Sequence, residues 1–280
     1  MTGKQAVVSS ELVQQFVGVG DTCELAEAEF TKQRMQGIRD RKDNPCGIEI
    51  GQFGAAIAFV ATALPGMRMF NRVLNFKGED VDRLKDVLQF YSVRGVTPEF
   101  EVAPHDHSSI AFEHLAEEGF RQADFHGAFV GNKLSGSVPS ERVTVTVVNS
   151  SSEFDKFSET YLRAWEVDSR YSSAALANIS FWRDRRDWCL YIARLDGQVA
   201  GVAILFKKGE VAYLANAAVI ENFRRNGVHS QLIRSRLQEA FTLGCRTIFS
   251  HAAWNSYSHR NMLRNGLQLC YTKAIWRYQT

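Results

Sequence analysis

A short loop between a strand-like run and an amphipathic helix carries the residue types most suited to binding an anion. Residues 211–219 form an apolar run that predicts a buried strand, and the apolar positions in residues 228–241 fall on one helical face. Arg224, Arg225 and Gly227 lie between them. The free N–H groups and the positive dipole end of a helix N-terminus favour phosphate, and glycine permits close backbone approach. The loop therefore predicts a phosphate site.

Two motifs in this half of the chain carry a family resemblance. Residues 219–230, with the pattern V-x-x-x-x-R-x-x-G-x, resemble the acyl-CoA pyrophosphate loop of the GNAT acetyltransferases. Residues 255–267 resemble the N-x-x-S-x-R-x-x-x-x-x-G-F helix of the same superfamily. The two motifs occur in the family's order and spacing, which is more specific than either motif alone. Residues 141–280 are therefore identified as a GNAT-like domain.

The resemblance implies that the chain binds acetyl-CoA as a cosubstrate and uses no metal. The pyrophosphate would lie on the loop, and the pantetheine arm would lie between two strands that part. The implied cofactor-binding residues are Ala217, Val219, Arg224, Arg225, Asn226, Gly227, Val228, His229, Ser230, Asn255 and Ser258. Asn255 has a second interpretation, because asparagine is also a common helix N-cap.

The sequence departs from the family pattern at two positions. His229 stands where most members have glycine or alanine, and Met262 stands where many members have a tyrosine that protonates the thiolate. Methionine cannot donate a proton. Tyr257 and Tyr271 are the nearest hydroxyls in the sequence, solvent is a second proton source, and a domain that binds CoA without turnover is a third reading.

The general base is also open on the sequence alone. The strand at residues 211–219 carries no carboxylate, which leaves Glu210, Glu221 or a water held by Asn216. The catalytic candidates are therefore Tyr257, Tyr271 and Glu221.

The order of elements before residue 131 resembles the order after residue 142. A helix at residues 108–119 with a terminal glycine, followed by a strand, parallels the helix and strand that begin at Ser256. This predicts a duplicated α/β (α+β) architecture of two tandem GNAT-like folds, each a mixed, mostly antiparallel sheet flanked by helices. The expected domains are a degenerate GNAT-like half at residues 1–135, without a phosphate loop, and an N-acetyltransferase half at residues 141–280. The Gly- and Ser-rich segment 131–142 is the expected linker.

Local signals predict several further elements. Residues 24–41 and 79–94 are expected to be helices, and residues 47–53 and 55–63 are expected to be paired strands. Ser150 and Glu153 predict a capping box, and Asp196-Gly197 predicts a hairpin turn.

The first half is not expected to bind CoA. Glu79, Asp80 and Asp82 stand at the point where the first half should carry a phosphate loop, and they would repel a pyrophosphate. The run His105-Asp106-His107 suggests a metal-binding site, but three consecutive side chains do not converge easily on one ion. A loop that caps the next helix is the better interpretation.

Composition places the chain among ordinary globular proteins. Its 280 residues carry a formal net charge of +2, with 45% hydrophobic residues, and the longest apolar run, residues 55–64, is too short to cross a bilayer. Neither nucleic acid nor a membrane is an expected partner. Five cysteines without a C-x-x-C pair, and an N-terminus without a signal pattern, predict a cytoplasmic protein. We expect it to be a monomer or a homodimer.

The favoured function is an N-acetyltransferase that moves the acetyl group of acetyl-CoA directly to the amine of a small molecule. A non-catalytic CoA-binding or interaction protein is the alternative motivated by Met262. A tandem-GNAT aminoacyltransferase is a third reading, which the near-neutral charge disfavours because binding tRNA needs a basic face.

Overall fold

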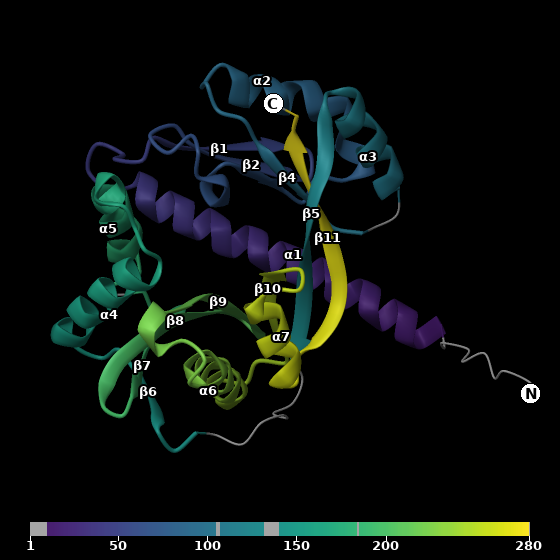
Figure 1. Ribbon diagram of the computed structural model, residues 1–280. Coiled ribbons are helices and arrows are strands. Elements are labelled where there is room, and N and C mark those ends of the chain that lie inside the picture. Colours follow the sequence, from purple (N-terminus) through teal and green to yellow (C-terminus); the bar gives the residue numbers. More distant parts are fainter. Residues whose placement is uncertain (1–9, 105–106, 132–139, 184, 280) are drawn as a thin grey trace, which may run out of the picture.

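The computed structural model describes residues 10–104, 107–131, 140–183 and 185–279, and within them one continuous sheet runs through the whole molecule (Figure 1). The strands are β1 Ile48–Phe53, β2 Ala56–Ala61, β3 Arg72–Leu74, β4 Glu99–Val102, β5 Phe120–Gly131, β6 Val143–Val147, β7 Trp188–Leu195, β8 Gln198–Lys208, β9 Val211–Val219, β10 Thr247–Ala253 and β11 Gln268–Tyr278. The helices are α1 Ser10–Arg39, α2 Leu84–Ser92, α3 Ser108–Glu117, α4 Ser151–Ala164, α5 Ser172–Phe181, α6 Val228–Thr242 and α7 Tyr257–Arg264. The mixed, mostly antiparallel α/β class is thereby confirmed.

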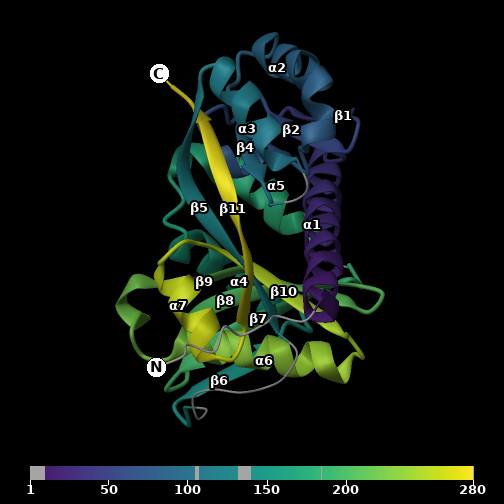
Figure 2. The same cartoon turned by 90° about the vertical axis from the view of Figure 1, so that its right-hand side faces the viewer.

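The two halves of the chain exchange their last strands. The sheet order is β1-β2-β3-β4-β11-β5-β10-β9-β8-β7-β6, so β11 lies between β4 and β5. The end of β11 pairs with β4 through Ala274↔Val102, and β5 pairs with β10 through Ala252↔Gly127. The long antiparallel pair of β5 and β11 stands at the centre in both views (Figures 1 and 2). Each half is therefore completed by a strand of the other.

Helices cover both faces of this sheet. Side chains of α1, α4 and α5 share core clusters on one face, and those of α6 and α7 fill a cluster on the other. On β11, Lys273 contacts carboxylates of α1, whereas its neighbour Ala274 packs in the cluster of α2 and α3. Because strand side chains alternate, α2 and α3 lie on the same face as α6 and α7. The face that carries α1, α4 and α5 is called the α1 face below.

Helix α1 is longer than the sequence indicates. The predicted start was residue 24, and the observed helix begins at Ser10 and runs along the molecule to Arg39. Gly18 and Gly20 are poor helix formers, which hides this first part from a propensity argument. The expected helix at residues 79–94 is also different, since its first turns form a 3₁₀ helix at Gly78–Arg83 and only Leu84–Ser92 is α-helical.

The local signals in the second half are confirmed. The Ser150 side chain accepts a hydrogen bond from the Glu153 N–H and caps α4. Asp196 and Gly197 take positive φ values of 49° and 83° and close the β7–β8 hairpin. In the first half, β1 and β2 pair antiparallel as expected. Residues 105–106 of the His-Asp-His run, and 132–139 of the expected linker, lie outside the described residues.

None of the described helices combines the length and the apolar composition that crossing a bilayer requires.

The strand exchange predicts that neither half folds alone. When residues 1–131 and 140–280 are produced as separate chains, each should lack a native cooperative melt, because β4 loses β11 and β10 loses β5. Mixing the two should restore a single transition by complementation, measured by circular dichroism. Two fragments that melt cooperatively on their own would contradict this prediction.

Candidate functional site

Strands β9 and β10 part in the middle of the sheet. Their parallel register runs from Thr247↔Val211 to Phe249↔Tyr213 and ends there, although both strands continue. The Ser250 hydroxyl donates to the Leu214 carbonyl at 2.8 Å and links the two strands next to their last backbone pair. Beyond it β9 and β10 are no longer paired, and the region between their unpaired backbones is called the strand gap below. Such a gap leaves main-chain groups free to hold an extended ligand.

A bulge in β9 lies beside the strand gap. The register with β8 shifts between Val202↔Ala218 and Ile204↔Ala215, and Asn216 takes a φ of 41°. Arg236 of α6, 1% exposed, supports the bulge because its guanidinium donates to the carbonyls of Ile204 at 3.0 Å and Ala215 at 2.9 Å. A bulge of this kind bends one strand away from its neighbour.

The predicted phosphate loop leads from β9 to the start of α6. Gly227 has φ 80° and ψ −5° and is the N-cap residue, and its carbonyl accepts from Gln231 N–H at 3.0 Å. Arg225 also has a positive φ, of 65°. The first-turn N–H groups of Val228, His229 and Ser230 have no intrahelical acceptor by geometry. Successive N–H groups around a left-handed residue form a concavity that suits an anion.

Charged and polar side chains hold this loop in place. The Arg224 guanidinium lies 3.0 Å from the Glu166 carboxylate, and its Nε donates to the Val219 carbonyl at 3.3 Å. The Asn226 amide donates to the Arg224 carbonyl at 3.0 Å. Arg225 is exposed and has no charged partner within the described residues. Arg225 is thus the arginine of the loop that remains available to a ligand.

His229 joins α6 to α7. Its Nδ1 lies 3.1 Å from the Asn261 amide nitrogen. Burial, together with the nearby charge of Arg236, lowers the pKa of His229 to about 4. The ring is therefore neutral at pH 7, and at this loop position it acts through its shape and hydrogen bonds rather than through charge.

The second motif begins α7 at the neighbouring strand end. Ser256, and not Asn255, is the N-cap residue, because its side chain accepts from the His259 N–H at 3.1 Å. Asn255 is exposed, and its side-chain oxygen accepts from Arg260 at 2.9 Å, which leaves the amide nitrogen free of described partners. Met262 is 4% exposed and packs in the core cluster of α6 and α7.

The other sequence candidates fall into three groups. Ala217 and Val219 are half-buried on β9 beyond the bulge, close along the chain to the phosphate loop, and Ser258 is half-buried in the first turn of α7. Tyr257 is 68% exposed at the start of α7, and Glu221 is exposed beside Arg224. Tyr271 lies elsewhere, on the α1 face, where its hydroxyl donates to Glu24.

A buried charged cluster on the α1 face was not anticipated from the sequence. Lys273 is fully buried, and its Nζ donates to Glu27 and lies 3.1 Å from Glu24. The remaining members are Arg72 of β3, Glu101 of β4, His126 of β5, His251 of β10 and Tyr271 of β11. A spacing of three residues places Glu24 and Glu27 on one side of α1, and this spacing was the available signal.

The cluster holds three carboxylates and two permanent cations. Burial opposes the ionisation of Glu27 and Glu101, but Arg72 and Lys273 outweigh it and hold the pKa of both carboxyls below their ordinary value. Burial raises the pKa of Glu24 in spite of Lys273. Glu24 is therefore the carboxylate of the cluster most ready to accept a proton.

His251 connects this cluster to the strand gap. It lies two residues beyond the last β9–β10 pair, and its ring nitrogens are 3.5 Å from Glu27 and 3.9 Å from Glu24. Burial lowers the pKa of His251 to about 3, so the ring is neutral near pH 7. Neither ring nitrogen has a hydrogen-bond partner among the described residues.

The ligand atoms of Glu24, Glu27 and His251 lie within 4.8 Å of one another, which raises the question of a metal. The Lys273 ammonium already contacts both carboxylates. Its positive charge occupies the place that a metal ion would take, so the donor set fits a lysine-centred ion cluster better.

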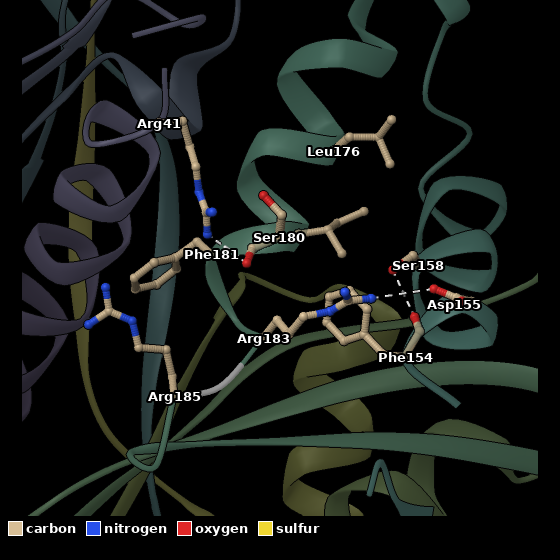
Figure 3. A pocket seen from close by; sticks show the side chains of 10 residues that line it. Arg41, Phe154, Asp155, Ser158, Leu176, Ser180, Phe181, Arg183 and Arg185 are labelled. Carbon is tan, nitrogen blue, oxygen red and sulfur yellow. Dashed lines mark hydrogen bonds and ion pairs between the residues drawn. The ribbon is translucent and has the colours of Figure 1, made fainter. Parts of the chain in front are cut away.

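A separate cavity of about 590 Å³ lies outside the strand gap, between α4, α5 and the end of α1 (Figure 3). Arg41 donates to the Ser180 carbonyl at 2.7 Å, and Arg183 lies 3.5 Å from Asp155. The Arg185 guanidinium lies over the Phe181 ring at 4.6 Å. None of the sequence-predicted site residues lines this cavity.

The buried histidines predict a loss of stability in mild acid. The folded-state pKa values of about 3 for His251 and about 4 for His229 lie below 6.5, so the unfolded chain binds more protons as the pH falls from 6.5 towards 4. Tm should therefore fall across this window. His251→Gln and His229→Gln should each flatten the dependence, whereas His114→Gln on α3 serves as the control. If Tm depends on pH with the same slope in the wild type, in both variants and in the control, the lowered pKa values of His251 and His229 are refuted.

Comparison with known proteins gives the family of the second half. Residues 152–266 match the model of the acetyltransferase (GNAT) family. No curated protein matches the chain.

The fold is shared with solved structures along most of the chain. A GCN5-related N-acetyltransferase from Kribbella flavida is 15% identical with a TM-score of 0.62, over 90% of this chain and 95% of that one. A functionally unknown conserved protein from Staphylococcus epidermidis is 14% identical with a TM-score of 0.60, over 87% and 98%. A tandem GNAT protein from the clavulanic acid biosynthesis pathway is 12% identical with a TM-score of 0.55, over 87% and 86%. The chain thus carries, at residues 152–266, a domain that belongs to the acetyltransferase (GNAT) family.

Proposed function

We propose that the protein is an acetyl-CoA-dependent N-acetyltransferase acting on the amine of a small molecule. The observation that carries this proposal is the strand gap, which opens beside the free N–H groups of α6. The CoA pyrophosphate would bind those N–H groups and Arg225. The pantetheine arm would lie in the strand gap against the backbone of Ala217 and Val219, with the Asn255 amide at its side.

The reaction needs two proton transfers. The amine nitrogen attacks the thioester carbonyl carbon, the C–N bond forms and the C–S bond breaks. The amine loses one proton to a base, and the CoA thiolate gains one. Holding both substrates side by side replaces an encounter in solution by a step within one complex.

Glu24 and His251 are the groups we assign to the amine proton. His251 lies on the α1 face just past the point where the strands part, and Glu24 stands behind it with the raised pKa. The Tyr271 hydroxyl donates to Glu24 and orients its carboxylate. Glu221 is less suited to this role, because it is exposed and faces Arg224.

Tyr257 is the hydroxyl that we assign to the thiolate side, since it starts α7 next to Asn255. Met262, at the position of the family's tyrosine, is buried in the core. That burial favours one second candidate function, a protein that binds CoA without turnover. Measuring the release of free thiol from acetyl-CoA with a range of amines separates this candidate from an acetyltransferase.

The five cysteines form no disulfide. Free thiols suit a reducing compartment, and we propose that the protein acts in the cytoplasm.

CoA should stabilise the protein through the phosphate loop. At a hundredfold excess over Kd, linkage gives about 2.7 kcal/mol, which corresponds to a rise in Tm of roughly 5–10 °C for a chain of this size. Gly227→Val should abolish this rise, because φ 80° is strained for a branched residue and the loop N–H groups would move.

Gly197→Val is the matched control for strain, since Gly197 has φ 83° in the distant β7–β8 turn and nothing within 4 Å of its side-chain position. It should lower Tm and keep the CoA-induced rise. Arg225→Glu should reduce the rise more than Arg224→Glu, because Arg224 is already paired with Glu166. An undiminished rise in Gly227→Val would overturn the loop assignment.

Glu24→Gln should lower kcat/KM by about 10²-fold, the usual contribution of a positioned base. Wild-type activity should fall as the pH drops through the raised pKa of Glu24, and the variant should lack this acidic limb. Glu29→Gln, on the same helix and paired with Lys208, is the control. A native-like pH profile in a folded Glu24→Gln protein would exclude the assignment.

A further inference from the structure

Arg34 is a buried arginine without a counterion. It lies in the middle of α1 and is 4% exposed. Its Nε donates to the Asn178 side-chain oxygen at 2.6 Å, and its guanidinium carbon lies 4.9 Å from the Phe70 ring centre and 5.9 Å from that of Trp182. Within the described residues no carboxylate pairs with it. Such a charge is costly to bury unless something neutralises it.

The other buried guanidiniums among the described residues, those of Arg72 and Arg236, have acceptors at a terminal nitrogen. Arg72 lies between Glu101 at 2.5 Å and Glu27 at 3.5 Å. Arg236 has no carboxylate, but three backbone carbonyls accept its N–H groups. Arg34 differs from both, because no described acceptor meets its two terminal nitrogens. Its two terminal nitrogens are therefore the donors that a ligand could satisfy.

Two further unpaired donors belong to the same cluster. Asn216 Nδ2 and Trp182 Nε1 are buried and have no hydrogen-bond partner among the described residues. The Tyr161 hydroxyl lies near the amides of Asn178 and Asn216, and its ring centre is 5.4 Å from that of Trp182. The free groups of this cluster are thus N–H donors. A ligand that fills it must bring acceptors.

The cluster adjoins the strand gap. Asn216 is the bulged residue of β9 and is followed directly by Ala217, which we place against the pantetheine arm. The other members come from α1, α4 and α5, on the same face of the sheet as His251. A ligand held here would therefore reach the acyl group from the α1 face.

We infer that the acceptor amine carries a carboxylate, as an amino acid does, and that Arg34 binds this carboxylate together with Asn216 and Trp182. The inference rests on the proposed function and names its substrate class. Arginine presents two parallel N–H donors that match a carboxylate, and the added amide and indole donors accommodate its remaining lone pairs. The carboxylate would also neutralise the Arg34 guanidinium, whose terminal nitrogens have no acceptor among the described residues.

Matched amine pairs test the inference in the intact protein. Thiol release would be measured at saturating acetyl-CoA with L-phenylalanine against phenethylamine, L-leucine against 3-methylbutylamine, and L-lysine against cadaverine. In the wild type, the carboxylate member of the accepted pair should have a kcat/KM at least tenfold higher, in line with one charge-assisted pair. Arg34→Met should bring that ratio close to one, chiefly by lowering kcat/KM for the carboxylate member of the pair.

Arg185→Met is the control, because Arg185 lines the separate cavity between α4, α5 and the end of α1 (Figure 3), called the outer cavity here. It should keep the wild-type ratio. A ratio that survives Arg34→Met, or that disappears in Arg185→Met, would overturn the inference. The Tm of ligand-free Arg34→Met should not fall, because the substitution removes a buried unpaired charge. A large fall in Tm with an unchanged ratio would show that Arg34 serves packing only.

A binding experiment distinguishes failure of this inference from failure of the proposed function. Calorimetric titration of the same three amino acids into the protein without acetyl-CoA should show binding that Arg34→Met abolishes. If no thiol is released and CoA does not bind, the proposed function fails, while this binding would still support the carboxylate site. If simple amines are acetylated as fast as their carboxylate partners, and no amino acid binds, the function stands and the inference is wrong.

Discussion

Lys273 has to be neutralised inside the protein, and the way this is achieved ties the molecule together. The residue is fully buried on β11, a strand that the second half contributes to the sheet of the first. Its partners Glu24 and Glu27 come from α1, and Arg72 and Glu101 extend the cluster into β3 and β4. Removing one member would leave an uncompensated charge in the core. The exchanged strands and the ion cluster therefore stabilise each other.

The exchanged strands and the ion cluster bring helix α1 of the first half close to the strand gap. At the first half's own helix start, Asp80 is buried and accepts hydrogen bonds from the backbone N–H groups of Ala55 and Lys77. A carboxylate at this place disfavours a phosphate. The first half instead provides α1, which crosses onto the face where the strand gap opens. In the proposed site, one half would contribute the phosphate loop and the strand gap, and the other half would contribute Glu24 and Arg34 beside them.

Local chemistry made much of the second half predictable. The strand, the loop glycine and the amphipathic helix of the phosphate loop lie next to one another in the sequence, and so do Asp196 and Gly197 of the hairpin. Features set by distant partners were not predictable. The strand exchange, the pairing of Arg224 with Glu166 and the approach of Glu24 to His251 join residues far apart in the chain. The N-cap residue of α7 was ambiguous in the sequence, because Asn255 and Ser256 are adjacent and both residue types cap helices.

The central claim is that CoA occupies the strand gap and the phosphate loop, with the acceptor on the α1 face. Hydrogen–deuterium exchange with and without CoA tests this claim most directly. The account predicts slower exchange in three segments, residues 215–219, 225–231 and 251–258, because the ligand would bind or cover their free N–H groups. Protection confined to the outer cavity around Arg183 and Arg185, or no protection at saturating CoA, would contradict it.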